Sequence, residues 1–407
     1  MKLLKIRAEG LPLIDNDTEI DFLTESPVRG NEQHELIHLF KNFYLNRTLT
    51  FTGLNAAGKT QILNVISFVM NLIQAKPINN TVGHFFNNTS NILNLGIDEK
   101  AKLTIYFYSN HSEDETINKL QTTITRTKDS SDDQYKYFIT DEKLFIKNTK
   151  KIRSKNDLYN FDTKKLSDID VKNRNSDDYL ALSNDVSLIN VFYNLKKYKK
   201  LFFRDMVGFT DFNVLSNFGN VPIELIKFLD PSIEFLKFKF IKDNEEENFS
   251  ISLKFIHDDR IITLDSPTEL NSVLSSGTVK GLGLFMTAIA TLVEGGVLIV
   301  DELENHFNRE ISLTLIHLFT DRKVNKEGAI LIFTTHYSEL LDTLDRNDSI
   351  YIVKKDNKIS LQKLSSELKR NDIRKSDQFI KGILKHTAPK YDAEINLKRF
   401  IKNAKKK

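Results

Sequence analysis

The run GLNAAGKT at residues 53–60 constrains the fold of this chain of 407 residues more than any other feature. It fits the pattern G-x-x-x-x-G-K-[ST] and stands between a short apolar run at 49–52 and a helical pattern at 61–75. Glycines allow such a loop to turn tightly, and backbone N–H groups at a helix N-terminus bind phosphate oxygens. Lys59 would reach the β- and γ-phosphates, and the Thr60 hydroxyl would ligate Mg²⁺. The predicted nucleotide-binding residues are Gly53, Asn55, Ala57, Gly58, Lys59, Thr60 and Gln61.

Apolar strands and amphipathic helices alternate in the last third of the chain. GVLIV at 296–300 and AILIF at 329–333 are near-continuous apolar runs, and the segments at 277–293 and 309–319 have helical spacing. This alternation is typical of a parallel sheet covered by helices on both faces. Several strand-like runs within 101–147 are separated by charged turns and predict an antiparallel layer. The predicted fold class is α/β, with a mostly parallel core sheet, an antiparallel β layer and an insertion.

Two carboxylates, Asp301 and Glu302, follow directly after the apolar run VLIV at 297–300. A buried strand that ends in carboxylates presents them at the edge of a doubly wound sheet where ligands bind. Asp301 is placed to hold Mg²⁺ through water. Glu302 is placed to orient and deprotonate an attacking water, as a general base does. We therefore predict Thr60 and Asp301 as metal-binding residues and Glu302 as a catalytic residue.

Two shorter motifs stand at fixed distances from this acidic pair. LSSGT at 274–278 opens a predicted helix, and its Gly277 precedes Asp301 by 24 positions. IFTTH at 332–336 ends a predicted strand, and its His336 follows Asp301 by 35 positions. Each motif alone is typical of an ordinary helix cap or of a structural histidine. Along the chain, the phosphate loop is followed by LSSGT, then by the acidic pair and then by IFTTH. The four motifs in this chain order resemble those of the soluble ATP-binding-cassette ATPases, P-loop NTPases that include the chromosome-maintenance and RecF-like heads.

This resemblance implies an ATP site shared between two subunits. In that family, a helix start of one subunit closes over the γ-phosphate held by the other, a role that falls here to Ser275, Ser276 and Gly277. A switch histidine, here His336, senses the γ-phosphate, and His306 would lie along the subunit interface. The implied cofactors are ATP and Mg²⁺. The implied activity is ATP hydrolysis by a head-to-head dimer.

Within this group, the chain resembles bacterial AAA-family ATPases of the abortive-infection and overcoming-lysogenization-defect type, over about residues 1–110 and 265–380. The resemblance implies the sensor or regulatory subunit of an antiphage system that controls a separate effector, a nuclease or toxin. Two other functions stay open. One is a DNA repair or recombination ATPase of the RecF and chromosome-maintenance type. The other is a nucleotide-switched scaffold with little turnover.

The chain departs from the family pattern at three places. Ala56 stands where relatives often have glycine, which is tolerable if the φ angle of Ala56 is negative. The glutamine that normally couples the nucleotide to the inserted lobe has no convincing counterpart, since neither Gln74 nor Gln121 has a suitable context. No aromatic residue for stacking on adenine can be selected either.

Composition divides the chain into four predicted parts. Residues 1–147 and 251–350 are the two halves of the ATPase core. Residues 148–250, rich in Lys, Asn and Asp and then in amphipathic patterns, are predicted to be an inserted helical subdomain. Residues 351–407 form a basic segment with 17 Lys and Arg against 6 Asp and Glu. Such a segment is either a nucleic-acid contact or a solvated tail.

Composition and missing motifs also exclude several classes of protein. The chain has no cysteine, so disulfides, thiolate nucleophiles and cysteine-bound metals are excluded. The longest apolar run, at 281–293, is too short to cross a bilayer, and the charged start MKLLKIRAEG differs from a signal peptide. We expect a cytoplasmic protein without a membrane partner. The absence of N-K-x-D and of a kinase catalytic-loop motif argues against a GTPase and a kinase.

Overall fold

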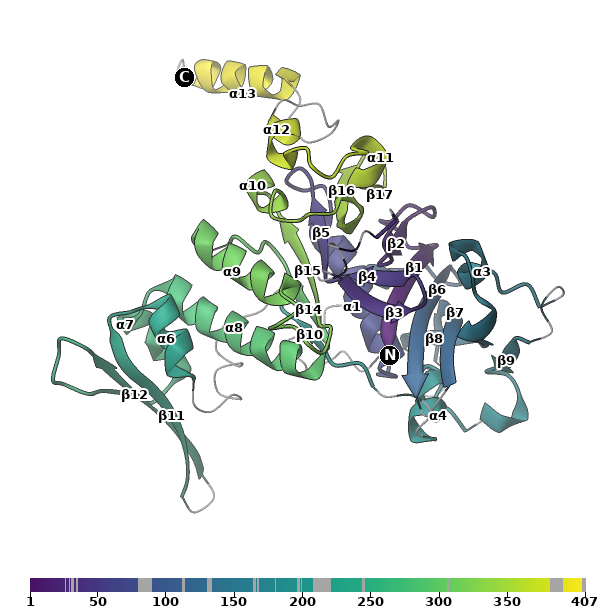
Figure 1. Ribbon diagram of the computed structural model, residues 1–407, viewed down its shortest axis with the longest axis horizontal. Helices are drawn as coiled ribbons and strands as arrows, with labels where there is room; N and C mark the ends of the chain where they lie inside the picture. Colours follow the sequence, from purple (N-terminus) through teal and green to yellow (C-terminus); the bar gives the residue numbers. More distant parts are fainter. Residues whose placement is uncertain are drawn as a thin grey trace.

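A computed structural model shows the arrangement of the chain (Figure 1). It describes residues 1–25, 27–28, 30, 33, 36–79, 90–111, 114–129, 134–163, 166, 168–179, 181–195, 198, 200–207, 221–243, 246–305, 307–380 and 391–404. His306, which the sequence analysis singles out, lies outside these residues.

The core of the protein is a sheet in the strand order β10-β14-β15-β5-β16-β17. All neighbouring pairs in it are parallel except β16 and β17. Every residue of the central strands β14, β15 and β5 is buried, which explains their near-continuous apolar runs. The strands are β10 (Phe203–Asp205), β14 (Val297–Val300), β15 (Ile330–Thr335), β5 (Thr48–Thr52), β16 (Ile350–Lys355) and β17 (Ile359–Lys363).

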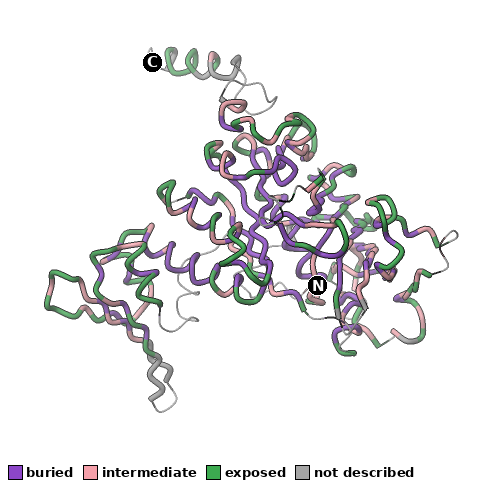
Figure 2. Tube along the Cα trace, in the orientation of Figure 1, coloured by how far each residue is buried: buried purple, intermediate pink, exposed green. Residues whose placement is uncertain are grey.

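Helices cover both faces of this sheet. Successive strand residues point to opposite faces, and each face belongs to a different apolar cluster. Val297 and Ile299 join the cluster of α1 (Lys59–Ile73), whereas Leu298 and Val300 join the cluster of α8 (Ser276–Glu294) and α9 (Arg309–Thr320). Figure 2 shows these buried strands running through the middle of the molecule. The predicted α/β core with a mostly parallel sheet is confirmed.

An antiparallel sheet packs on the far side of α1, through the same apolar cluster. Its strand order is β2-β1-β6-β7-β8-β9, and all its neighbouring pairs are antiparallel, which confirms the predicted antiparallel layer. A separate hairpin of β3 and β4 lies beside it. The strands are β1 (Lys2–Glu9), β2 (Glu19–Asp21), β3 (Leu36–Phe40), β4 (Phe43–Asn46), β6 (Lys100–His111), β7 (Asp114–Lys128), β8 (Tyr135–Asn148) and β9 (Asp170–Asn173).

The described part of 148–250, predicted to be a helical insertion, contains strands as well as helices. Its helices are short, and its strands serve three different sheets. β9 extends the antiparallel sheet and β10 joins the core sheet, while β11 and β12 pair with β13 to make a separate lobe (Figure 1). The elements are α3 (Lys155–Tyr159), α4 (Ile189–Asn194), α6 (Ile223–Leu229), β11 (Ile233–Asp243), β12 (Glu246–Phe255) and β13 (Ile262–Leu264).

Contacts with the neighbouring sheets explain why the helices in this segment are shorter than their sequence patterns. Amphipathic helical spacing of apolar residues runs from 187 to 203, but α4 ends at Asn194. Tyr198 then stacks on Phe192 with ring centroids 5.4 Å apart, and its hydroxyl donates to Asn118 of β7 over 2.9 Å. These contacts turn the chain so that residues from Phe203 pair with the edge of β14. Sheet pairing here overrides local helix propensity.

The predicted basic segment 351–407 begins inside the core sheet. β16 starts at Ile350, so the predicted boundary falls within a strand, and β17 closes the sheet edge. The short helices α10 (Ser338–Leu341), α11 (Leu364–Glu367) and α12 (Lys375–Ile380) cluster near this edge, and α13 (Tyr391–Ala404) projects at the C-terminal end (Figure 1). The remaining helices are α2 (Ser90–Leu93) and α7 (Leu270–Val273). The division of the chain into units stays a prediction.

One helix in the described part of the chain, α8, is long and apolar enough to cross a membrane by length and composition alone. Its apolar window is 67% buried inside the protein. Leu282 and Ala288 of α8 are fully buried in the second apolar cluster. A buried core helix passes the same test of length and composition, so the finding is weak support for a membrane span.

Candidate nucleotide-binding site

Three strands of the core sheet bring the predicted site residues to one edge. β5 leads into the loop that precedes α1, β14 ends just before Asp301, and β15 ends just before His336. β15 lies between the other two, and all three are parallel. Their carboxyl ends therefore meet at the same edge of the sheet, where ligands of open α/β sheets bind.

The loop before α1 needs glycine at its two ends. Gly53 has a φ of 152°, and a Cβ there would lie 2.5 Å from the carbonyl oxygen of Val353 in β16. Gly58 is the N-cap of α1 and has a left-handed φ of 97°. Both backbones are therefore closed to residues with a side chain. The N-terminus of α1, with its free N–H groups, opens directly behind the loop.

Ala56 does not meet the condition of a negative φ angle under which alanine is tolerable here. Its φ is 61°, in the left-handed region, although it carries a Cβ. A residue other than glycine reaches this region only at a cost of about 1 kcal/mol. Ala56 and Asn55 are exposed at the tip of the loop, whereas Ala57 is buried and donates its N–H to the carbonyl of Leu54 over 3.2 Å. Gln61, in the first turn of α1, is half-buried.

Lys59 lies folded into the loop. It is 6% exposed, and its Nζ donates to the carbonyls of Gly53 and Leu54 over 3.1 and 3.0 Å. The same Nζ lies 3.3 Å from Nδ1 of His336. Burial lowers the pKa of Lys59, and the nearby carboxylates of the acidic strand oppose this shift. The cation is thus held where phosphate oxygens would enter the loop.

Asp301 joins the loop to β15 through two threonines. The hydroxyl of Thr60 donates to Oδ2 of Asp301 over 2.6 Å, and the hydroxyl of Thr334 donates to Oδ1 over 2.5 Å. The N–H of Glu302 in turn donates to Oγ1 of Thr334 over 2.7 Å. This network holds a hydroxyl and a carboxylate side by side at the mouth of the phosphate loop.

These two oxygen donors fit a magnesium ion. Mg²⁺ in proteins takes oxygen ligands, commonly one or two carboxylates with waters and substrate phosphates. Thr60 and Asp301 would supply the protein's share, and each is partly open to solvent. Within the described residues, no group of three His, Asp or Glu side chains forms a metal site by itself. The donors present therefore fit a metal shared with a bound nucleotide.

Glu302 is exposed and held in a strained backbone conformation. Its φ is 46°, in the left-handed region. Its carboxylate accepts from Asn305 Nδ2 over 3.4 Å and lies 3.4 Å from Nε2 of His336. The N–H of His336 is itself held by Oε1 of Glu304 over 2.5 Å. Backbone strain of this kind persists where the surroundings fix a functional side chain.

The predicted signature residues stand apart from this edge within the same chain. Ser275 caps α8, accepting from the N–H of Thr278 over 3.0 Å. Ser276 starts the helix, and both serines are exposed, while Gly277 is half-buried. In Figure 1 the start of α8 lies beside α7, toward the lobe of β11 and β12, far from α1 and β5. The chain thus brings Lys59, Thr60, Asp301, Glu302 and His336 together, but not the signature.

Two residues near the site were missed by the sequence analysis. Thr334 links Asp301 to Glu302, and its position two residues before His336 is the signal that could have found it. Asp205 ends β10 beside β14, and its Oδ1 accepts from the N–H of Val207 over 2.8 Å. Burial, with Asp301 nearby, raises the pKa of Asp205 to about 6. No sequence signal marks Asp205, because β10 has only three residues.

The two glutamines considered for nucleotide coupling lie elsewhere. Gln74 follows α1 and donates to the carbonyl of Leu201 over 2.9 Å. Gln121 belongs to β7 of the antiparallel sheet. The strand beside the acidic one, β10, carries Asp205 and no glutamine. Neither glutamine therefore supplies the coupling residue of the family pattern.

The phosphate loop, the order of the core sheet and the acidic strand define a P-loop NTPase fold. The chain belongs to the family described as "AAA domain, putative AbiEii toxin, Type IV TA system", whose model matches residues 49–342. No curated protein matches the chain at a significant level.

The solved structures that are similar to the chain include two SMC heads. One is a crystal structure of an SMC head bound to the C-terminal winged-helix domain of ScpA, with 15% identity and a TM-score of 0.42, covering 91% of this chain and all (100%) of that one. The other is the SMC head domain from Thermotoga maritima, with 11% identity and a TM-score of 0.39, covering 89% of this chain and 99% of that one.

Proposed function

We propose that the protein is a Mg²⁺-dependent ATPase whose active site is completed by a second copy of the chain. One observation carries the proposal. Lys59, Thr60, Asp301 and Glu302 meet at one sheet edge, connected through His336 and Thr334, while the exposed signature at Ser275 caps its own helix away from this edge. A second subunit would bring its own signature to the phosphates.

Each residue at the sheet edge has a definite task in this proposal. Backbone N–H groups of the loop and Lys59 bind the β- and γ-phosphates of ATP. Thr60 and Asp301 hold Mg²⁺, which when bound neutralises phosphate charge. Glu302 accepts a proton from the attacking water, and His336, 3.4 Å from its carboxylate, orients it.

The signature serves the same reaction from the partner chain. Ser275 already caps α8, and the free N–H groups of this helix start, with their positive partial charge, suit a γ-phosphate oxygen. ATP would therefore join two subunits head to head, and hydrolysis would release them. Two such composite sites form in a symmetric dimer.

The cellular role we propose is regulation in antiphage defence in the cytoplasm, with a separate nuclease or toxin as effector. Its support is the description of the family to which the chain belongs, which names a toxin and a type IV toxin–antitoxin system. The ATP-driven change between one and two subunits would be the signal passed to that effector. The resemblance to ATPases of the overcoming-lysogenization-defect type supports the same proposed role in antiphage defence.

Glu302→Gln tests the catalytic assignment. The substitution keeps the size of the side chain but removes its basicity, so ATP turnover should fall by about 10²–10⁴-fold while ATP still binds. Because hydrolysis no longer separates the subunits, the variant with ATP and Mg²⁺ should elute on sizing as a dimer of about twice 47.0 kDa. Steady-state ATPase assays and light scattering measure the two effects.

Two further variants sharpen this test. Glu310→Gln alters another exposed acid, at the start of α9, and should leave turnover unchanged. Lys59→Ala should abolish ATP binding, because it removes the cation that faces the phosphates. Turnover at the native rate in Glu302→Gln would place the base elsewhere. Retained ATP affinity in Lys59→Ala would remove the assignment of the phosphate loop.

A further inference from the structure

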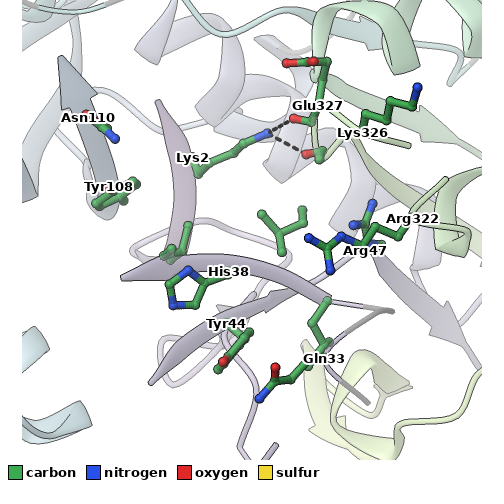
Figure 3. Close-up of a pocket in the computed structure, with 14 residues that line it drawn as sticks. Lys2, Gln33, His38, Tyr44, Arg47, Tyr108, Asn110, Arg322, Lys326 and Glu327 are labelled. Carbon is green, nitrogen blue, oxygen red and sulfur yellow. Dashed lines mark hydrogen bonds between the residues drawn. The ribbon is translucent and has the colours of Figure 1, made fainter. Parts of the chain in front are cut away.

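A second polar cavity, of about 680 Å³, lies on the side of the core sheet away from the phosphate loop (Figure 3). Arg47 immediately precedes β5, Gly328 lies two residues before β15, and both line this cavity. The phosphate loop, Asp301 and His336 follow the opposite ends of β5, β14 and β15. Because these strands are parallel, the cavity and the nucleotide site sit at opposite edges of one sheet.

Among the residues that the structure describes, four cations line the cavity, against a single carboxylate. They are Lys2 from β1, Arg47, and Arg322 and Lys326 from the loop after α9. The carboxylate belongs to Glu327, which is exposed and in Figure 3 points away from Arg47. A concave site with a net positive charge attracts anions.

Arg47 gives the strongest evidence that the cavity binds an anion. Its side chain is only 5% exposed, and its Nη1 donates to the carbonyl of Asn325 over 2.7 Å. Its Nε, also buried, has no hydrogen-bond partner within the described part of the chain. A buried guanidinium donor without a partner costs free energy unless a ligand or water accepts from it. Figure 3 draws the Arg47 head beside that of Arg322 at one end of the cavity.

The loop that carries Arg322 and Lys326 is held rigidly. Asn325 is fully buried, and its side-chain amide donates to the carbonyls of Phe319 and Ala329 while accepting from the N–H of Ala329. Lys2 supports the same wall, since its Nζ donates to the carbonyls of Gly295 and Gly328 over 2.8 and 2.5 Å. Lys2 thus contributes positive charge to the cavity, while its ammonium group is already hydrogen-bonded to the backbone. Arg47 and Arg322 are the residues that can donate hydrogen bonds to a ligand.

An aromatic pair stands at the other end of the cavity. His38 of β3 and Tyr44 of β4 have ring centroids 5.1 Å apart, and both line the cavity. Figure 3 shows their rings on the side opposite Lys2, with Gln33 nearby. Rings at one end and paired guanidinium groups at the other match a ligand with a flat ring and a phosphate. The volume lies within the range of small-molecule sites.

We infer that this cavity is a second binding site, separate from the ATP site, for a small phosphorylated ligand of nucleoside monophosphate size. Its phosphate lies against Arg47 and Arg322, and its ring lies against the His38–Tyr44 pair. The inference is independent of the proposed hydrolysis, because it uses the other edge of the sheet.

Adenosine monophosphate and inorganic phosphate are the probes for this site. The full-length chain carrying Lys59→Ala serves as background, since it lacks the phosphate-loop cation. We expect one saturable site per chain by titration calorimetry, with adenosine monophosphate binding at least about tenfold tighter than phosphate. Adding Arg322→Ala should weaken binding about tenfold, the loss expected for a charge-assisted hydrogen bond.

The adjacent cation provides a matched control. Lys323 is exposed on the same loop but does not line the cavity, so Lys323→Ala should change the affinity by less than about twofold. Equal loss in both variants would indicate general charge attraction and overturn the site. Binding of phosphate as tightly as the nucleotide would overturn the assigned ring contact. Absence of saturable binding, or binding of single-stranded DNA alone, would overturn the proposal as a whole.

Discussion

Ala56 shows how a single residue at the phosphate loop carries strain. Its φ of 61° places a Cβ in the left-handed region, and the residue is exposed, so no packing of the methyl group compensates. Its neighbour Ala57 is buried and has no such φ. The loop therefore contains two consecutive alanines, of which Ala56 has a positive φ angle and Ala57 does not.

Ala56→Gly should stabilise the protein by about 1 kcal/mol, because glycine adopts the left-handed conformation without a clash. Urea denaturation with an unchanged m-value measures the change in the free energy of unfolding. Ala57→Gly is the control and should destabilise by at least roughly 0.5–1 kcal/mol, since it adds freedom to the unfolded chain and removes a buried methyl group. Destabilisation of equal size in both variants would contradict the conformation given to Ala56.

The residues of the site differ in how well the sequence predicts their placement. The phosphate loop, Asp301, Glu302 and His336 are marked by local motifs, and the structure brings them to one edge. Asp205 has no such mark, because its place depends on which strands become neighbours, whereas Thr334 lies inside the IFTTH motif but gains its role only when β15 pairs with β14. The sign of φ at Ala56 also depends on the folded loop, so the sequence alone left it open.

At the scale of elements, long apolar strands were predictable and short paired ones were not. β14 and β15 are buried on both faces, so their sequences carry a continuous signal. β10 has three residues and becomes a strand only by pairing with β14. β11 alternates buried Leu236 and Phe238 with exposed lysines, a period of two that its Lys-rich composition concealed.

A buried ion pair fastens the segment after β9 to the antiparallel sheet. Glu142 of β8 is 0% exposed and accepts from the hydroxyls of Thr122 and Ser187, each over 2.8 Å, and from the N–H of Leu188 over 2.6 Å. Arg174 lies 3.4 Å from its carboxylate. Burial raises the pKa of Glu142, and these hydrogen bonds and Arg174 oppose the shift.

Glu142→Ala should destabilise the protein by about 3–5 kcal/mol, because it leaves the Arg174 guanidinium buried without its counter-charge. Chemical denaturation followed by circular dichroism measures the loss. Glu234→Ala is the control, since the Glu234–Lys254 pair, at 2.7 Å, joins β11 to β12 on the surface and should matter far less. A similar small effect in both variants would mean that the buried network does not hold the segment.

At the scale of the whole molecule, one sheet carries two sites at its opposite edges. The phosphate loop and the acidic strand open at the carboxyl ends of β5 and β14, and the basic cavity opens at the other edge. The signature lies on neither, because α8 carries it out toward the lobe of β11 and β12 (Figure 1). The proposed ATP site therefore calls for two chains.

Mixing two inactive variants tests most directly whether one ATP site is divided between two chains. Lys59→Ala removes the phosphate-loop cation. Ser276→Glu sets a negative charge against the γ-phosphate, yet suits the N-terminus of α8. Each variant alone should be inactive.

In a mixed dimer of these two variants, one site joins the intact loop of one chain to the intact signature of the other. An equal mixture should thus recover about one quarter of the wild-type ATPase rate, since about half of the dimers are mixed and each has one sound site. A rate equal to the sum of the two separate variants would show that each chain completes its own site, and it would contradict the account.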